Sequence, residues 1–302
     1  MTTERPPTID PQAATRWQQI ALPLSPWLHE EVARRMAERL DWINLQPQAW
    51  VHWEPLRAGM QAQAALLARY PKAQCFWVQT VNGQLETTLK TSTHAWWQPS
   101  RWRAEPREVG LPKPGVQMLW ANMALHMAVD PQTLINHWRD ALAVDGFLMF
   151  SCLGPDTLRE LRQLYQALGW PAPAHEFTDM HDWGDMLVQA GFAEPVMDME
   201  RIELTFETPE RLLQELRELG RNLHPARFPG LRGRGWRERL QQAMEEKLAD
   251  PQHGGQLKLT FEVVYGHAFK PQPRIGVSAQ TVVSLDDMRL ALHATKSQPR
   301  QP

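Results

Sequence analysis

Short apolar segments alternate with longer amphipathic segments along the first half of the chain. The apolar segments, which have the length and continuous hydrophobicity of buried strands, are Ala49 to Trp53, Cys75 to Gln79, Val116 to Trp120 and Phe147 to Ser151. Helices are predicted over residues 25–40, before the first of these strands, and over residues 55–69 and 130–143, between them. Strands that are apolar throughout and separated by helices are typical of a parallel sheet covered on both faces.

The second half of the chain predicts helices between longer strands. The helices are expected over residues 155–168, 179–190, 208–220 and 236–248, and the strands over 196–206 and 256–270. Between residues 82 and 114 the pattern is weaker. There we expect a helix through Leu89 and a short strand at Arg101 to Glu105.

Length and composition predict one ordinary soluble globular protein. The chain has 302 residues, 43% of them hydrophobic and 22% charged, and a formal net charge of -2. This charge argues against broad binding to nucleic acid or to a membrane surface. The polar, proline-containing start predicts neither a secretory signal nor a membrane span, and therefore a cytoplasmic location.

The order of the predicted elements suggests a single main domain with extensions. We expect this domain over residues 25–270, with a helical lid at about residues 207–250. A flexible segment of residues 1–24 precedes it, and a mobile tail of residues 271–302 follows it.

Cysteine, tryptophan and histidine suggest structural rather than chemical uses. Cys75 and Cys152 lie in predicted strands without further ligands at metal spacing, so we expect buried, reduced thiols. The 14 tryptophans are expected mainly in the core. Asp179, His181 and Asp182 fit the first turn of a helix, and because no completing ligand is visible we predict no metal site.

Several segments together carry a resemblance to one enzyme family. They are Asn122 to His126, Met149 to Leu161, His181 to Asp185, Leu212 to Gly220 and Thr260 to His267. These segments resemble malonyl-acyl-carrier-protein O-methyltransferase of biotin biosynthesis, and the likeness covers Trp27 to Lys270. The resemblance implies an α/β, Rossmann-like sheet of the class I methyltransferase type, with helices on both faces and a helical insertion before the last strand. It also implies S-adenosylmethionine as the methyl donor.

The loop after the first strand departs from the family's pattern. The family reads V-L-D-x-G-C-G-x-G, whereas this chain reads Trp53-Glu54-Pro55-Leu56-Arg57-Ala58-Gly59 after Val51 and His52. Proline and arginine therefore stand at the first two glycine positions, and only Gly59 remains. Glycine lets a backbone approach a ligand closely, while proline fixes φ and removes an N–H donor.

The resemblance also points to candidate site residues. The cofactor-binding candidates are Gly59, Gln79 at the ribose position of the second strand, and Glu54 and Glu105 as replacements for lost carboxylates. Asn122 and His126 follow the fourth strand, where the acceptor would meet the methyl group; a capping Asn and a half-buried His explain them equally well. A basic segment suits an acidic acyl carrier protein, and its candidate residues are Arg217, Arg221, Arg232, Arg234 and Arg237.

Two functions follow from these residues. In the first, the chain uses S-adenosylmethionine to methylate the free carboxylate of malonyl-acyl-carrier protein. In the second, it keeps the fold and the carrier surface but has lost the cofactor, and acts as a binding, scaffold or regulatory protein. The altered loop favours the second function, and the family resemblance favours the first.

Overall fold

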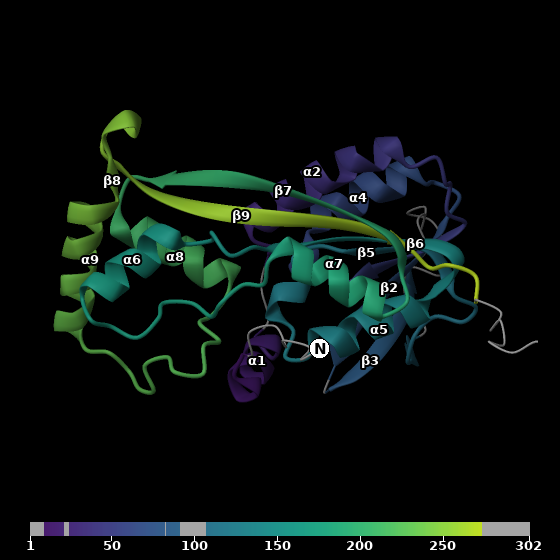
Figure 1. The fold of residues 1–302 in the computed structure, drawn as a ribbon, viewed down its shortest axis with the longest axis horizontal. Coiled ribbons are helices and arrows are strands. Elements are labelled where there is room, and N and C mark those ends of the chain that lie inside the picture. The colour runs from purple at the N-terminus through teal and green to yellow at the C-terminus, as the bar shows by residue number, and fades with distance from the viewer. Residues whose placement is uncertain (1–8, 21–23, 82, 91–106, 274–302) are drawn as a thin grey trace, which may run out of the picture. The chain divides into compact units, whose positions relative to one another are not determined.

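The computed structural model of the protein describes residues 9–20, 24–81, 83–90 and 107–273 (Figure 1). The chain divides into two compact units, residues 1–271 and 272–302. The described residues lie almost entirely in the first unit. The expected strand at Arg101 to Glu105, including the candidate Glu105, lies outside the described residues, as does nearly all of the expected tail.

One sheet runs through the first unit in the order β4-β3-β2-β1-β5-β6-β9-β7. Its strands are β1 Ala49–Trp53, β2 Gln74–Val81, β3 Gln84–Lys90, β4 Arg107–Val109, β5 Val116–Ala121, β6 Leu142–Leu153, β7 Ala193–Phe206 and β9 Gln256–Phe269, with the short β8 Ala249–Asp250 paired to β9. Strands β2, β1, β5 and β6 are mutually parallel, and β9 is antiparallel to β6 and β7. The predicted parallel sheet is therefore confirmed for its central strands.

Helices cover both faces of this sheet. They are α1 Pro11–Gln18, α2 Trp27–Arg39, α3 Pro55–Ala58, α4 Met60–Arg69, α5 Pro131–Ala141, α6 Arg159–Ala167, α7 Met180–Gln189, α8 Pro209–Leu219 and α9 Arg234–Leu248. Helices α2 and α4 pack on one face, and α5 and α7 pack on the other (Figure 1). Because successive strand residues point to opposite faces, Trp50 and Trp120 join the first layer, and Val51 and Leu119 the second. The α/β fold expected from the resemblance is confirmed.

The predicted insertion before the last strand is present as α8 and α9. These helices gather with α6 around the extended part of β7 and β9, on the left in Figure 1. Thr208 accepts a hydrogen bond from the backbone N–H of Arg211 and caps α8. Threonine followed by proline, at Thr208-Pro209, is a typical sequence signal for the start of a helix.

The expected uses of cysteine and of most described tryptophans are confirmed. Cys75 and Cys152 are buried free thiols, and burial raises the pKa of the Cys75 thiol to about 12. Trp50, Trp120, Trp138 and Trp183 are among the largest fully buried side chains of the described residues. No helix of the described ranges has the length and apolarity needed to cross a membrane.

Two predicted features near the edges were wrong or missed. The helix expected through Leu89 is instead β3, an antiparallel partner of β2. Asn-Gly at residues 82–83 is a typical hairpin signal, and Gly83 has φ of +79°. Helix α1 lies within the segment expected to be flexible; Asp10 caps it, just as Asp130 caps α5.

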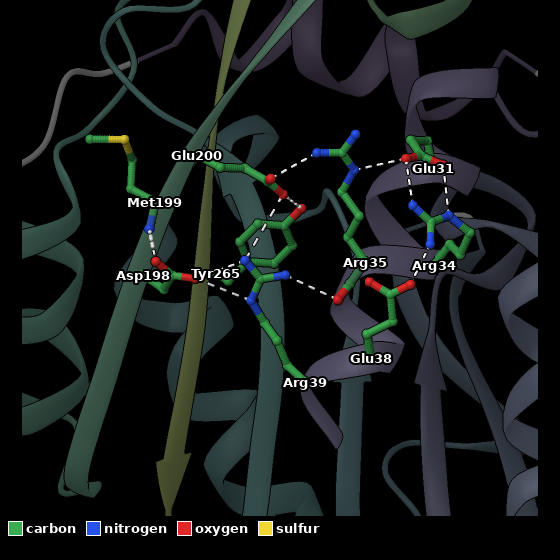
Figure 2. Close-up of polar contacts among 9 residues, drawn as sticks. All are labelled: Glu31, Arg34, Arg35, Glu38, Arg39, Asp198, Met199, Glu200 and Tyr265. Carbon is green, nitrogen blue, oxygen red and sulfur yellow. Dashed lines mark hydrogen bonds and ion pairs between the residues drawn. The ribbon is translucent and has the colours of Figure 1, made fainter. Parts of the chain in front are cut away.

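Helix α2 is anchored to strands β7 and β9 through charged side chains (Figure 2). Arg35 Nη1 lies 2.8 Å from Glu200 Oε2, and Arg39 Nη2 lies 2.7 Å from Asp198 Oδ2. Tyr265 from β9 donates a hydrogen bond of 2.5 Å to Glu200, and the Arg39 guanidinium lies 3.7 Å from the centre of the Tyr265 ring. These contacts hold α2 in place, and its first turns reach the candidate site.

Candidate functional site

The strand order reverses between β1 and β5. From β1 the chain proceeds to β2 on one side, while β5 and β6 lie on the other side. In open α/β sheets, ligands bind outside the carboxyl ends of the strands at such a switch point. Glu54 and Gly59 follow β1 and Asn122 follows β5, so the structure brings these predicted residues together. Gln79 lies in β2, two residues before that strand ends.

Glu54 ties the end of β1 to β2. Its backbone is left-handed, with φ of 48° and ψ of 50°, a strained conformation for a residue with a side chain. Its carboxylate Oε1 accepts a hydrogen bond of 2.7 Å from the backbone N–H of Thr80. Burial raises the pKa of Glu54, while the hydrogen bond from Thr80 opposes that rise. The carboxylate proposed to replace the lost acid is thus used within the protein.

Gly59 separates α3 from α4, whereas the sequence predicted one continuous helix over residues 55–69. Its φ of +120° strains any other residue. The carboxylate of Glu30, from α2, accepts hydrogen bonds of 2.8 Å from Met60 N and 3.0 Å from Gln61 N. A Cβ on Gly59 would lie 2.9 Å from Glu30 Oε2. The one retained glycine thus makes room for a side-chain anion that caps α4.

Arg57 binds the end of α1. Its Nη2 donates to the carbonyl oxygens of Trp17, Gln18 and Ile20 at 3.0, 3.0 and 2.7 Å. Its guanidinium also lies 4.7 Å from the centre of the Trp17 ring. The last carbonyls of a helix lack intrahelical partners and carry partial negative charge, so a guanidinium there is favourable. Burial lowers the pKa of Arg57.

Asn122 forms a bridge across the switch point. Its amide Nδ2 donates to the carbonyl oxygen of Ala58, the last residue of α3, and at 2.8 Å to that of His29 in α2. Its Oδ1 accepts a hydrogen bond of 2.6 Å from Ser151 Oγ in β6. The side chain is only 1% exposed. Both donors and one acceptor position of this amide are therefore already used.

His126 lies in a buried turn after β5, at residues Leu125–Met127. Its Nδ1 accepts a hydrogen bond of 3.3 Å from Leu153 N, so the neutral ring carries its proton on Nε2. Burial, and then the neighbouring His175 and His29, hold the pKa of His126 well below its usual value. No hydrogen bond joins His126 to Asn122 among the described contacts. The ring is a neutral, packed imidazole near pH 7.

Buried histidines make stability depend on pH. Burial lowers the pKa of His29 and of His52 from 6.5 to about 4. Because the pKa of each histidine is lower in the folded state, its contribution to the free energy of unfolding is fully present above the unfolded pKa of 6.5. That contribution is lost as the pH falls toward 4. We expect urea unfolding at pH 5 to show about 2 kcal/mol less stability per histidine than at pH 7.5.

A His52→Gln variant isolates this effect from Glu54, whose raised pKa acts in the opposite direction. The difference in unfolding free energy between pH 7.5 and pH 5 is expected to shrink by about 2 kcal/mol in the variant. An unchanged difference would show that His52 is not buried in its neutral form.

Several known proteins are similar to this chain over most of its length. The relative from Gallionella capsiferriformans is 39% identical over 268 residues, covering 85% of this chain and 88% of that protein. Relatives from Methylovorus and Laribacter hongkongensis are each 36% identical, over 83% and 82% of this chain and 84% of each relative. All are named malonyl-[acyl-carrier protein] O-methyltransferase. The chain belongs to this family.

Comparisons with family models and with solved structures add little to this assignment. No family model matches the chain. Solved structures similar to it include the YcgJ protein of Bacillus subtilis, at 12% identity and a TM-score of 0.46, covering 80% of this chain and 99% of that one. A putative methyltransferase of Bacillus halodurans has 13% identity and a TM-score of 0.41, over 78% and 99% of the two chains.

The described residues of this family member do not fit S-adenosylmethionine at the switch point. Trp53, Pro55, Ala58 and Asn122 are all buried by protein atoms. The polar groups of Arg57, Asn122 and Glu54, which would face a ligand, instead form hydrogen bonds to α1, α2 and β2, respectively. A cavity of about 420 Å³ lies beside α1, and none of the residues predicted to bind cofactor lines it. Gly59 and Asn122 thus hold structural contacts where the family resemblance implies a cofactor.

The predicted carrier-binding arginines of this methyltransferase-family chain fall into two groups. In the first group the guanidinium contacts other parts of the protein. Arg221 is exposed, but its guanidinium lies 5.2 Å from the Trp17 ring, and its Nη1 donates to Gly220 O at 2.8 Å. Arg232 lies among aromatic rings, 4.3 Å from the centre of Trp236 and 4.4 Å from Phe228.

The second group consists of exposed arginines: Arg217, Arg234 and Arg237. None of their side chains forms a hydrogen bond or ion pair with residues of the described ranges.

Sequence reasoning missed the partners that fill the switch point. Glu30 showed only a charge suited to the start of a helix, and Trp17 lay in a segment expected to be flexible. Their contacts with α4 and Arg57 join positions about 30 and 40 residues apart. No local pattern signals such pairs.

Proposed function

We propose that this chain binds an acyl carrier protein through the exposed surface of its lid, without using S-adenosylmethionine. The observation that carries the proposal is the position of Arg234 and Arg237 in the first turns of α9, exposed and without a carboxylate partner among the described residues. The start of a helix is the positive end of the helix dipole, so a cation placed there is electrostatically unfavourable. A binding role explains their presence there.

The surroundings of these arginines suit a protein partner. Leu231 is fully exposed, and Phe228 is 44% exposed beside Arg232. Apolar and arginine side chains side by side are typical of interface centres. The relatives are named for malonyl-acyl-carrier protein, and acyl carrier proteins are acidic. Charge complementarity therefore favours such a carrier, with the malonyl-loaded form as the first one to test.

Binding to malonyl-acyl-carrier protein tests this proposal. The double variant Arg234→Glu, Arg237→Glu is expected to weaken binding about tenfold or more at low salt, with a smaller effect at high salt. The matched control is Lys72→Glu, Lys113→Glu, which makes the same change in net charge at exposed positions before β2 and β5. The control is expected to bind like the wild type. Equal affinity of both double variants would remove the lid surface from the function.

Methyl transfer is the second candidate, because the chain belongs to a family named for it. Incubation with malonyl-acyl-carrier protein and methyl-labelled S-adenosylmethionine separates the two functions. We expect carrier binding and no labelled ester. A labelled ester that depends on the chain would establish the second candidate instead.

A further inference from the structure

Helix α1 is held against two parts of the molecule, the segment after β1 and the segment after α8. On one side, Arg57 from the loop after β1 donates to the carbonyl oxygen of Trp17 in α1 and to that of Ile20 just beyond its end. On the other side, Asp10 N donates a hydrogen bond of 2.8 Å to Leu223 O, and Arg227 Nη1 lies 2.6 Å from Asp10 Oδ2. Both Leu223 and Arg227 follow α8. Helix α1 thus connects the loop to the lid.

Trp17 is the centre of this connection. The guanidinium groups of Arg57 and Arg221 lie 4.7 and 5.2 Å from its ring centre. The ring is 6% exposed and packs in a small core with Ile9, Ala14 and Leu223. Cation–π contacts of this kind gain strength when they are shielded from water. One side chain therefore joins an arginine of the loop to an arginine of the lid.

Helix α2 also contacts the loop after β1. Glu30 supplies the anion at the start of α4, and His29 Nδ1 lies 2.7 Å from the carbonyl oxygen of Arg57. An N-terminal helix end is a ready site for a ligand's anionic group. In this chain a carboxylate of the protein already fills it. A ligand whose anionic group bound to the N–H groups of Met60 and Gln61 would have to displace Glu30.

We infer that α1 and α2 are built-in occupants of the family's cofactor site, fastened by Arg57 and Glu30, and that this chain does not take S-adenosylmethionine. The inference shares with the proposed function the claim that S-adenosylmethionine is not used, but it does not depend on carrier binding. Loss of carrier binding leaves it intact, and cofactor binding overturns it whatever the lid does.

Hydrogen–deuterium exchange of the full chain tests the inference. The backbone amides of residues 14–20 are expected to be protected in the wild type, and Arg57→Ala is expected to raise their exchange about tenfold or more. Arg16→Ala is the matched control, since Arg16 is exposed on the same helix and its side chain bonds to no described residue. Arg57→Lys keeps the charge without the planar fork, and an intermediate rate is expected.

The same experiment includes S-adenosylmethionine. We expect the ligand to leave the exchange of residues 14–20 and 54–61 unchanged in the wild type. Protection of residues 54–61 by the ligand would overturn the inference. So would equal exchange of residues 14–20 in the wild type and in Arg57→Ala.

Discussion

An Asn122→Asp variant is expected to lose about 3–5 kcal/mol of unfolding free energy. The change keeps the shape of the side chain but replaces the donor Nδ2 with an oxygen. That oxygen would face the carbonyl oxygens of Ala58 and His29 in a buried position. Hydrogen-bond acceptors would then face one another without a donor, and the new carboxylate would be buried without a neighbouring cation. Urea unfolding at pH 7.5 measures the loss.

Gln166→Glu is the matched control, because it makes the same amide-to-carboxylate change at an exposed position of α6. Its effect is expected to stay below about 0.5 kcal/mol. If Asn122→Asp were as stable as this control, the hydrogen bonds from Asn122 to α2 and α3 would not exist in solution.

A Gly266→Ala variant is expected to lose about 3 kcal/mol or more. Gly266 lies in β9 opposite Phe150 of β6, and a Cβ there would overlap the Phe150 ring. That ring is fully buried and packs against Trp138, with ring centres 5.8 Å apart. It has no free space into which to move. Thermal and urea unfolding measure the cost.

A double-mutant cycle locates the cause of this loss. In a Phe150→Ala background the ring is absent, so Gly266→Ala is expected to cost far less than it does alone. Gly235→Ala is the control: Gly235 is exposed in α9 and nothing lies within 4 Å of an added Cβ. There alanine is expected to stabilise by up to about 1 kcal/mol. Equal costs at Gly266 with and without Phe150 would contradict the packing described.

The central strands and the helices between them were predictable because their signals are local. Apolar stretches gave β1, β5 and the core of β6, and Asp130-Pro131 and Thr208-Pro209 marked the starts of α5 and α8. Local signals were also present where the prediction was wrong or incomplete. Asn-Gly before β3 is a hairpin signal, and Asp10-Pro11 before α1 is a signal for the start of a helix.

The candidate site was predictable only in part. The sequence placed Glu54, Gly59 and Asn122 at neighbouring strand ends, and the structure brings them together. It did not show what these residues contact. Glu30 approaches Gly59, and Trp17 approaches Arg57, only because α1 and α2 return to the carboxyl edge of the sheet. Such contacts depend on packing between distant segments, which no short pattern encodes.

We infer that protein side chains close the cofactor site of this family member. Calorimetric titration of the folded full-length chain with S-adenosylmethionine, and separately with S-adenosylhomocysteine, tests it most directly. We expect no saturable heat up to roughly 1 mM of either ligand, a concentration far above micromolar dissociation constants. Saturable binding with a dissociation constant in the micromolar range would contradict the account.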